Sequence, residues 1–171
     1  MPILTQTSSA NTAIALDLSN LATSTTFLGG RESTQIDNST TNYVDCIVSA
    51  LGIVGHATTA PVIGQYIGIW VWGSDRSIAV TAIDVLDGLD SAETLTHAGV
   101  LNSLRMATAP PTVTAATAAL LHYTQPFGIA QLFGGVMPKF WGLYVAHNHA
   151  GALGAANSGK FSFAGITYTS T

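Results

Sequence analysis

Apolar residues alternate along several short segments of the chain, and the clearest segment is 65–72. Successive side chains of a strand point to opposite faces of a sheet, so this segment has two faces, and both are apolar. One face carries Ile67, Ile69 and Val71, and the other carries Tyr66, Gly68, Trp70 and Trp72. A strand of an antiparallel sheet commonly has one polar face. The second apolar face must therefore be covered by a loop of the same chain or by a neighbouring subunit.

Other strands are predicted where β-branched and aromatic residues lie between turn signals. A strand pair is expected within residues 13–28, single strands over 43–54, 79–85, 120–123, 140–147 and 160–169, and helical turns within 91–100 and 130–133. In the last strand Phe161 and Phe163 share a face, whereas Ile166 has the opposite parity. Gly165 lies at this change of parity, which predicts a β-bulge there.

The short strands, frequent turns and near absence of helical periodicity predict one all-β domain. We expect a β-sandwich of jelly-roll type with short helical turns over residues 13–171. Residues 1–12 are rich in Ser, Thr and Asn and show no periodicity. They are predicted to form a flexible N-terminal arm.

The composition indicates that the surface of this domain has unusually few charges. Charged residues make up 8% of the 171 residues, and five Lys and Arg against nine Asp and Glu give a net charge of −4, whereas an ordinary soluble domain is roughly 25% charged. Five basic residues cannot build a phosphate-binding surface, so nucleic acid is not an expected partner. A surface with so few charges promotes association. We therefore expect much of it to be buried against other chains.

No membrane partner is expected either. The most apolar run, residues 61–73, is interrupted by glycines and a glutamine, and it is shorter than the roughly 18 residues that a spanning helix needs. The first residues lack the basic and apolar regions of a signal peptide. We expect synthesis in a cytoplasm without secretion.

The loop over residues 154–160 matches the first seven positions of a phosphate-binding P-loop. The next residue is Phe161 rather than a magnesium-binding Ser or Thr, and a strand follows where a P-loop needs a helix. This loop is interpreted as a glycine-rich hairpin loop. No nucleotide cofactor is expected.

Histidines and acidic residues raise two metal hypotheses. His147 and His149 lie two apart at the end of a strand and can point the same way, but a zinc site needs a third protein ligand. The sequence cannot place His56, His97 or His122 beside them. Four acids lie within ten positions, namely Asp84, Asp87, Asp90 and Glu93. They could bind calcium, act as paired carboxylates of a hydrolase, or form a solvated turn, and the solvated turn is the interpretation adopted, with no metal site assigned.

Nucleophilic chemistry is not expected. The chain has no Gly-x-Ser-x-Gly nucleophile motif, and Cys46 lies inside a predicted strand, where a cysteine is usually an inert apolar residue. Aromatic residues are the remaining candidates for recognition. The possible interaction surface comprises Tyr66, Trp70, Trp72, Phe140 and Tyr144. Such rings serve either in core or interface packing or as a platform for sugars.

Three segments together resemble a known class of protein. They are GGRES at 29–33, AQLFGGVMPKFWG at 130–142 and KFSF at 160–163. With the low charge and the abundance of Ala, Thr and Gly, they resemble small virion proteins of tailed bacteriophages, of the capsid decoration or cement type. The resemblance implies a β-sandwich-like subunit, commonly a homotrimer, that sits on the shell of the major capsid protein and strengthens it. It implies no catalytic residue or cofactor, and by analogy the N-terminal arm would clamp neighbouring subunits.

The sequence therefore predicts a non-enzymatic virion structural protein on the capsid surface, with the major capsid protein and further copies of itself as partners. The alternative is a carbohydrate- or receptor-binding module, like a head fibre or adhesin, with Tyr66, Trp70 and Trp72 as stacking residues. An enzyme of the metal or carboxylate type is the third possibility.

Overall fold

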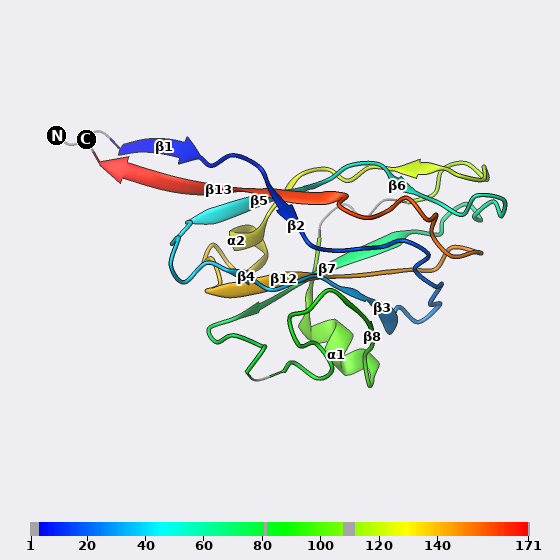
Figure 1. The fold of residues 1–171 in the computed structure, drawn as a ribbon, viewed down its shortest axis with the longest axis horizontal. Helices are drawn as coiled ribbons and strands as arrows, with labels where there is room; N and C mark the ends of the chain where they lie inside the picture. The colour runs from blue at the N-terminus through cyan, green and yellow to red at the C-terminus, as the bar shows by residue number, and fades with distance from the viewer. Residues whose placement is uncertain (1–3, 81, 108–111, 171) are drawn as a thin grey trace.

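Two antiparallel sheets stack face to face in the computed structural model, which describes residues 4–80, 82–107 and 112–170 (Figure 1). The first sheet has the order β1-β13-β5-β11, and β2 also pairs with β13. Its strands are β1 (Leu4–Ser8), β2 (Thr12–Ile14), β5 (Asp45–Ala50), β11 (Phe127–Gly128) and β13 (Phe161–Ser170).

The second sheet has the order β8-β3-β12-β7-β9, and β4 also pairs with β12. Its strands are β3 (Gly29–Glu32), β4 (Ile36–Asp37), β7 (Ile67–Ser74), β8 (Ser91–Thr94), β9 (Arg105–Met106) and β12 (Phe140–His147). A two-stranded sheet pairs β6 (Ile53–Val54) with β10 (Leu121–His122), and the helices are α1 (Ala98–Ser103) and α2 (Ile129–Leu132). The prediction of an all-β sandwich is confirmed, while the jelly-roll connectivity stays a prediction.

The main core lies between the two sheets. Its centre is the long antiparallel pair of β7 and β12, which runs from Phe140 opposite Ser74 to His147 opposite Ile67. The alternation predicted from the sequence is confirmed here. The inward side chains of these strands are Ile67, Ile69, Val71, Trp141, Leu143 and Val145, and all are buried in this core.

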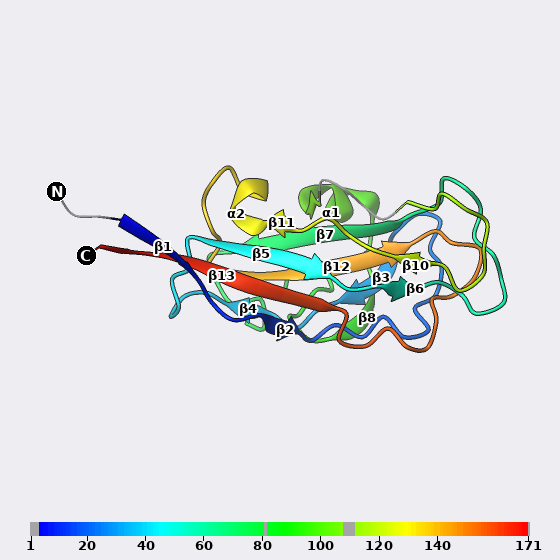
Figure 2. The same cartoon turned by 90° about the horizontal axis from the view of Figure 1, so that it is seen from above.

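A second apolar cluster lies on the outer face of the β7–β12 sheet. Residues 75–80, 82–90 and 95–104, which include α1 and flank β8, cover this face (Figures 1 and 2). The buried members of the cluster are Trp70, Trp72, Ile78, Leu86, Leu95, Leu101, Leu104, Tyr144 and Ala146. The sequence left two possible covers for the second face of β7, a loop of the same chain or a neighbouring subunit. In the structure, a loop of the same chain covers it. The double-sided apolar strand is therefore no evidence for a neighbouring subunit.

Several predicted elements are wrong or shorter than expected. Residues 79–85, of which residue 81 lies outside the described residues, form a turn closed by a bridge between Ile83 and Leu86 rather than a strand. Within 13–28 only β2 forms, because Leu16, Leu18 and Leu21 bury their side chains from a loop. The helical turn expected within 91–100 corresponds to β8 followed by α1. Burial of loop side chains produces the same apolar spacing as a strand does.

The predicted bulge at Gly165 is also wrong. The pairing of β13 with β5 is continuous through Gly165, which lies opposite Cys46. The extra residue lies in the N-terminal partner instead, where Ser9–Asn11 oppose Ala164 and Gly165. Gly165 is required for another reason, since a Cβ there would lie 2.4 Å from the ring of Tyr43.

The N-terminal arm has regular structure in its described part. Residues 1–12 are predicted to be flexible, but β1 pairs with the end of β13 over five residue pairs, from Leu4 opposite Ser170 to Ser8 opposite Ile166. Short polar sequences carry a weak strand signal, so only the long-range partner reveals this strand. Residues 1–3 lie outside the described residues.

Candidate functional site

The predicted aromatic surface is largely inside the protein. Trp70, Trp72 and Tyr144 have exposed fractions of 6%, 1% and 0%, and Tyr66 and Phe140 are half-buried. Phe27 covers this group, stacking on Tyr66 with ring centroids 4.7 Å apart and lying 5.6 Å from Trp70. The Tyr144 hydroxyl donates to the backbone oxygen of Leu28 at 2.5 Å, and burial raises its pKa above the ordinary value. The two tryptophans therefore present no open ring face to a sugar.

The acidic segment is divided among three structural roles. The carboxylate of Asp84 accepts from the backbone and hydroxyl of Thr96, and the backbone bond lowers its pKa. Asp90 forms an ion pair with Arg31, with Nε and Oδ1 2.6 Å apart. Asp87 and Glu93 instead approach Glu32, with ligand oxygens of all three within 4.8 Å of one another.

Glu32 is the residue of this acidic group that the sequence analysis missed. It is completely buried, and its two carboxyl oxygens accept from the backbone N–H groups of Asp87 at 2.9 Å and Gly88 at 3.0 Å. Burial raises the pKa of Glu32 to about 7, although these two hydrogen bonds lower it. Because the chain itself satisfies this carboxyl group, the group is accounted for without a cation.

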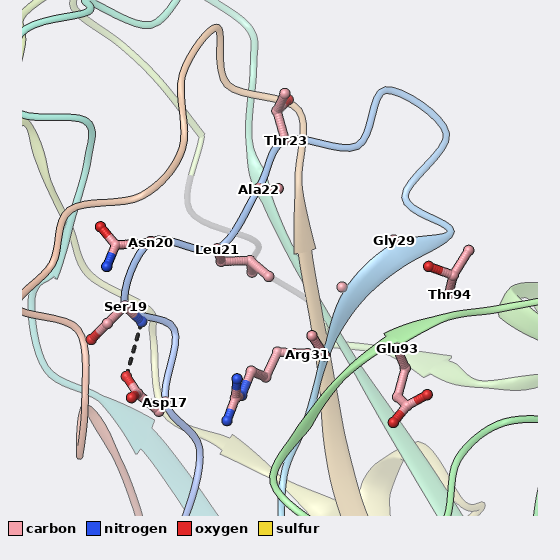
Figure 3. Close-up of a pocket in the computed structure, with 12 residues that line it drawn as sticks. Asp17, Ser19, Asn20, Leu21, Ala22, Thr23, Gly29, Arg31, Glu93 and Thr94 are labelled. Carbon is pink, nitrogen blue, oxygen red and sulfur yellow. Dashed lines mark hydrogen bonds between the residues drawn. The ribbon is translucent and has the colours of Figure 1, made fainter.

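A polar pocket of about 320 Å³ opens between the loop after β2 and the strands β3 and β8. Figure 3 shows Asp17, Arg31, Glu93 and Thr94 around it, with Asp17 accepting from the backbone N–H of Ser19 at 2.9 Å. The bonds to Ser19 lower the pKa of Asp17. The guanidinium of Arg31 is engaged by Asp90. The pocket therefore offers hydrogen-bonding groups but no free pair of catalytic groups.

The loop that resembles a P-loop, residues 154–160, has a structural role. Its central residue Asn157 is fully buried. The amide group of Asn157 accepts from the backbone N–H of Val54 at 2.7 Å and donates to the backbone oxygens of Val54 and Gly154 at 2.8 Å each. The loop thus fastens β6 to the end of the sandwich, and β13 follows it. The loop is rich in glycine as expected, but the prediction of a hairpin loop is wrong, because the strands before and after it, β12 and β13, belong to different sheets.

Three of the five histidines come together at one end of the second sheet. His147 ends β12, His149 follows in the next loop, and β10 contributes His122. The ring centroids of His149 lie 4.8 Å from those of His122 and 5.2 Å from those of His147. The other two histidines have local roles, since Nδ1 of His97 accepts from Gly99 at the start of α1 and Nδ1 of His56 accepts from the next loop.

Burial keeps the three clustered imidazoles neutral. It lowers the pKa of His122 and His147 below the ordinary value and that of His149 to about 3. The thiol of Cys46 is likewise buried, and burial raises its pKa to about 12. A thiol in this state is a poor nucleophile, as the sequence analysis expected from its position.

A largely exposed two-stranded ribbon is formed by β1 and residues Ile166–Ser170 of β13. It extends beyond the body, with the two chain ends at its tip (Figures 1 and 2). One face carries Thr5, Thr7, Thr167 and Thr169, and the hydroxyls of Thr7 and Thr167 lie 2.8 Å apart. The other face carries Leu4, Gln6, Ser8, Ile166, Tyr168 and Ser170. All ten residues are uncharged.

Both long edges of this ribbon are open. β1 is the edge strand of its sheet, and β5 pairs with β13 only as far as Ile166. Over the described residues, no further strand pairs with Thr167–Ser170. The ribbon therefore offers unpaired backbone N–H and C=O groups along each side.

Comparison with known proteins adds no relative. The chain matches no protein-family model, no curated protein and no solved structure. Among the described residues, no helix is long and apolar enough to cross a membrane. Function must therefore be argued from the ribbon, the polar pocket and the buried polar groups.

Proposed function

We propose that the protein is a non-enzymatic structural subunit that assembles with other chains through the β1–β13 ribbon. The main support for this proposal is that the ribbon is uncharged, exposed on both faces and open at both edges. A two-stranded hairpin alone in water is only marginally stable. Proteins normally protect such edges with lysines, prolines or covering loops, and the ribbon has none of these within its ten residues.

Strand addition is the mode of association that this ribbon fits. A partner strand laid along Thr167–Ser170 or along β1 would satisfy the open backbone groups. The threonine face could pack against a similar polar β-branched face, and Leu4 and Tyr168 would supply apolar contacts on the other side. Leu4 is 66% exposed and Tyr168 50% exposed, so both are available to a partner.

The opposite end of the molecule supplies a second, apolar contact surface. Leu51, Leu121 and Tyr123 are 67%, 49% and 65% exposed. They are neighbours, because a Cβ on Gly52 would lie within 4 Å of both Leu121 and Tyr123. Contact surfaces at two ends suit a subunit that touches more than one neighbour in a closed assembly.

Together with the resemblance described above, these features support a capsid decoration or cement role. In this proposal the protein sits on the outer surface of a bacteriophage capsid, with the major capsid protein and two further copies of itself as partners. The ribbon bridges neighbouring subunits and thereby strengthens the shell. The alternative glycan- or receptor-binding role loses its stacking residues, because Trp70 and Trp72 are buried.

The test measures binding to purified capsids that lack the protein. We compare the wild type with the double variant Thr5→Lys/Thr169→Lys, which places like charges opposite one another in the ribbon. The expected result is a loss of capsid binding of about tenfold or more, since a charge pair there costs more than about 1.4 kcal/mol in the bound state.

The matched control is Asn102→Lys/Ser103→Lys, which adds the same two charges at exposed positions of α1. It should bind capsids as the wild type does. Unchanged binding of the ribbon variant, or failure of the wild type to bind, would overturn the proposal. Light scattering checks the trimer separately, and a stable monomer at micromolar concentration would contradict it.

A further inference from the structure

The three clustered histidines are sealed from solvent at the end of the sandwich. His122, His147 and His149 are 3%, 0% and 2% exposed. They come from β10, from the last residue of β12 and from the loop after it. These segments are far apart in sequence, so the fold brings three imidazoles into one closed space.

Most of the unpartnered polar atoms of the structure belong to this cluster. Among the described residues, five buried side-chain nitrogens or oxygens have no hydrogen-bond partner, and three of them are Nε2 of His122 and both ring nitrogens of His149. Folded proteins pair nearly all buried polar groups, so a concentration of unpaired ones indicates a missing partner. Each neutral imidazole has one ring nitrogen with a lone pair, and a metal ion could take the lone pair of each ring.

His147 already has the hydrogen bonding of a metal-bound histidine. Its Nε2 lies 2.9 Å from the backbone oxygen of Leu21, and since a carbonyl only accepts, Nε2 carries the proton. Its Nδ1 therefore has a lone pair, which accepts a hydrogen bond from the backbone N–H of His149 at 3.2 Å, and a metal ion would displace this long bond. Metal-ligating histidines usually donate their second ring nitrogen to a carbonyl or carboxylate in this way.

The spacing of the rings suits a shared ion. With metal–nitrogen bonds of about 2.0–2.1 Å at tetrahedral angles, the centroids of two ligating imidazoles lie roughly 5 Å apart. Two of the three separations, those of His149 from His122 and from His147, are 4.8 and 5.2 Å. Small ring rotations are still needed, because the ligand atoms of the three residues do not yet lie as close together as those of Glu32, Asp87 and Glu93.

We propose that His122, His147 and His149 bind one transition-metal ion, with zinc as the preferred ion. Three neutral imidazoles are a borderline-soft donor set that suits zinc and not calcium or magnesium. The three rings leave one position of a tetrahedral site, which a water molecule would fill, and the ion would tie β10 to the end of β12. This site is independent of the ribbon and of the proposed capsid role.

The experiment uses tag-free protein purified from zinc-supplemented cells and dialysed against metal-free buffer. Elemental analysis should find about one zinc ion per chain. Cobalt added to the zinc-free protein should give the visible absorption of a tetrahedral site. Free zinc at about 100 times its Kd should raise Tm by roughly 5–10 °C.

The variants His122→Ala and His149→Ala should each lose the bound zinc and the Tm response. The control His97→Asn keeps the acceptor at the start of α1 and should retain both. Absence of zinc from the wild type, with no cobalt spectrum, would overturn the inference even if the alanine variants do not fold. Full zinc retention by folded His122→Ala or His149→Ala protein would overturn it as well.

Discussion

Two regions of the protein bury ionisable side chains, but only one of them provides those side chains with hydrogen-bond partners. At Glu32, a completely buried carboxyl accepts two hydrogen bonds from the backbone of residues 87 and 88. At His149, an almost equally buried imidazole has no hydrogen-bond partner for either ring nitrogen within the part of the chain that the structure describes. Both groups lie on or beside the second sheet, so their environments differ in partners rather than in depth.

This difference shows that Glu32 has a structural role, whereas His149 lacks the partners that a buried polar group needs. Glu32 holds the 75–104 segment against the sheet, because the loop donates its backbone N–H groups to the carboxyl. Among the described residues, the ring nitrogens of His149 have no hydrogen-bond partner. A satisfied buried group stabilises a fold only while its partners remain, whereas an unsatisfied group costs free energy unless a ligand arrives. Substitutions at the two positions should therefore change the free energy of unfolding in opposite directions.

The largest effect is expected from Glu32→Ala. This change removes both acceptors and leaves the backbone N–H groups of Asp87 and Gly88 unpaired beside a new cavity. At pH 5 it should lower the free energy of unfolding by about 4 kcal/mol, measured by urea denaturation. The control Glu93→Ala removes a half-buried acid of the same cluster and should cost less than about 1 kcal/mol. Equal losses from the two variants would contradict the role given to Glu32.

A slightly smaller change in stability is expected when Glu32 passes from its neutral to its charged form. Its pKa is about 7 in the folded protein against an ordinary value of 4.5. Because the folded state holds this proton more tightly, the contribution of Glu32 to stability falls as pH rises from 4.5 to 7 and stays low above that. The shift corresponds to about 3 kcal/mol.

The measurement is the free energy of unfolding at pH 4, 5.5 and 8, for the wild type and for Glu32→Gln. The glutamine cannot ionise, so the variant lacks the pH dependence that Glu32 contributes. The wild type should therefore lose stability relative to the variant on going to pH 8. Parallel curves would show that the carboxyl ionises in the folded protein as easily as in the unfolded chain.

The parts of the fold that the sequence predicted are those with strong local periodicity. The alternation of Ile67, Ile69 and Val71 with Trp70 and Trp72 correctly divided β7 between two faces, and the bounds of β12 were predicted as observed. The cover of the outer face could not be chosen, because a loop and a second subunit bury tryptophans equally well. β1 was missed since its pairing depends on a partner at the other end of the chain.

The buried polar groups show the same limit more sharply. The sequence drew attention to the acids of residues 84–93, but the residue they surround is Glu32, which comes from a different strand. It also placed His147 and His149 on one side of a strand end. The third imidazole, His122, reaches them only through the position of β10, and no local pattern encodes that position.

The smallest effect should come from His149→Phe, and its sign is what matters. A phenyl ring has nearly the shape of the imidazole but no nitrogens, so it removes two buried unpaired atoms without opening a cavity. With a chelator present, the variant should be about 1 kcal/mol more stable than the wild type, which raises Tm by roughly 2–4 °C in calorimetry. Glu32→Ala should lower Tm under the same conditions, because the backbone N–H groups of Asp87 and Gly88 lose their acceptors. The control His97→Phe removes the acceptor at the start of α1 and should lower Tm slightly. A loss of stability in His149→Phe comparable to that of Glu32→Ala would mean that the imidazole is held by a partner even without metal, and the contrast between the two regions would then disappear.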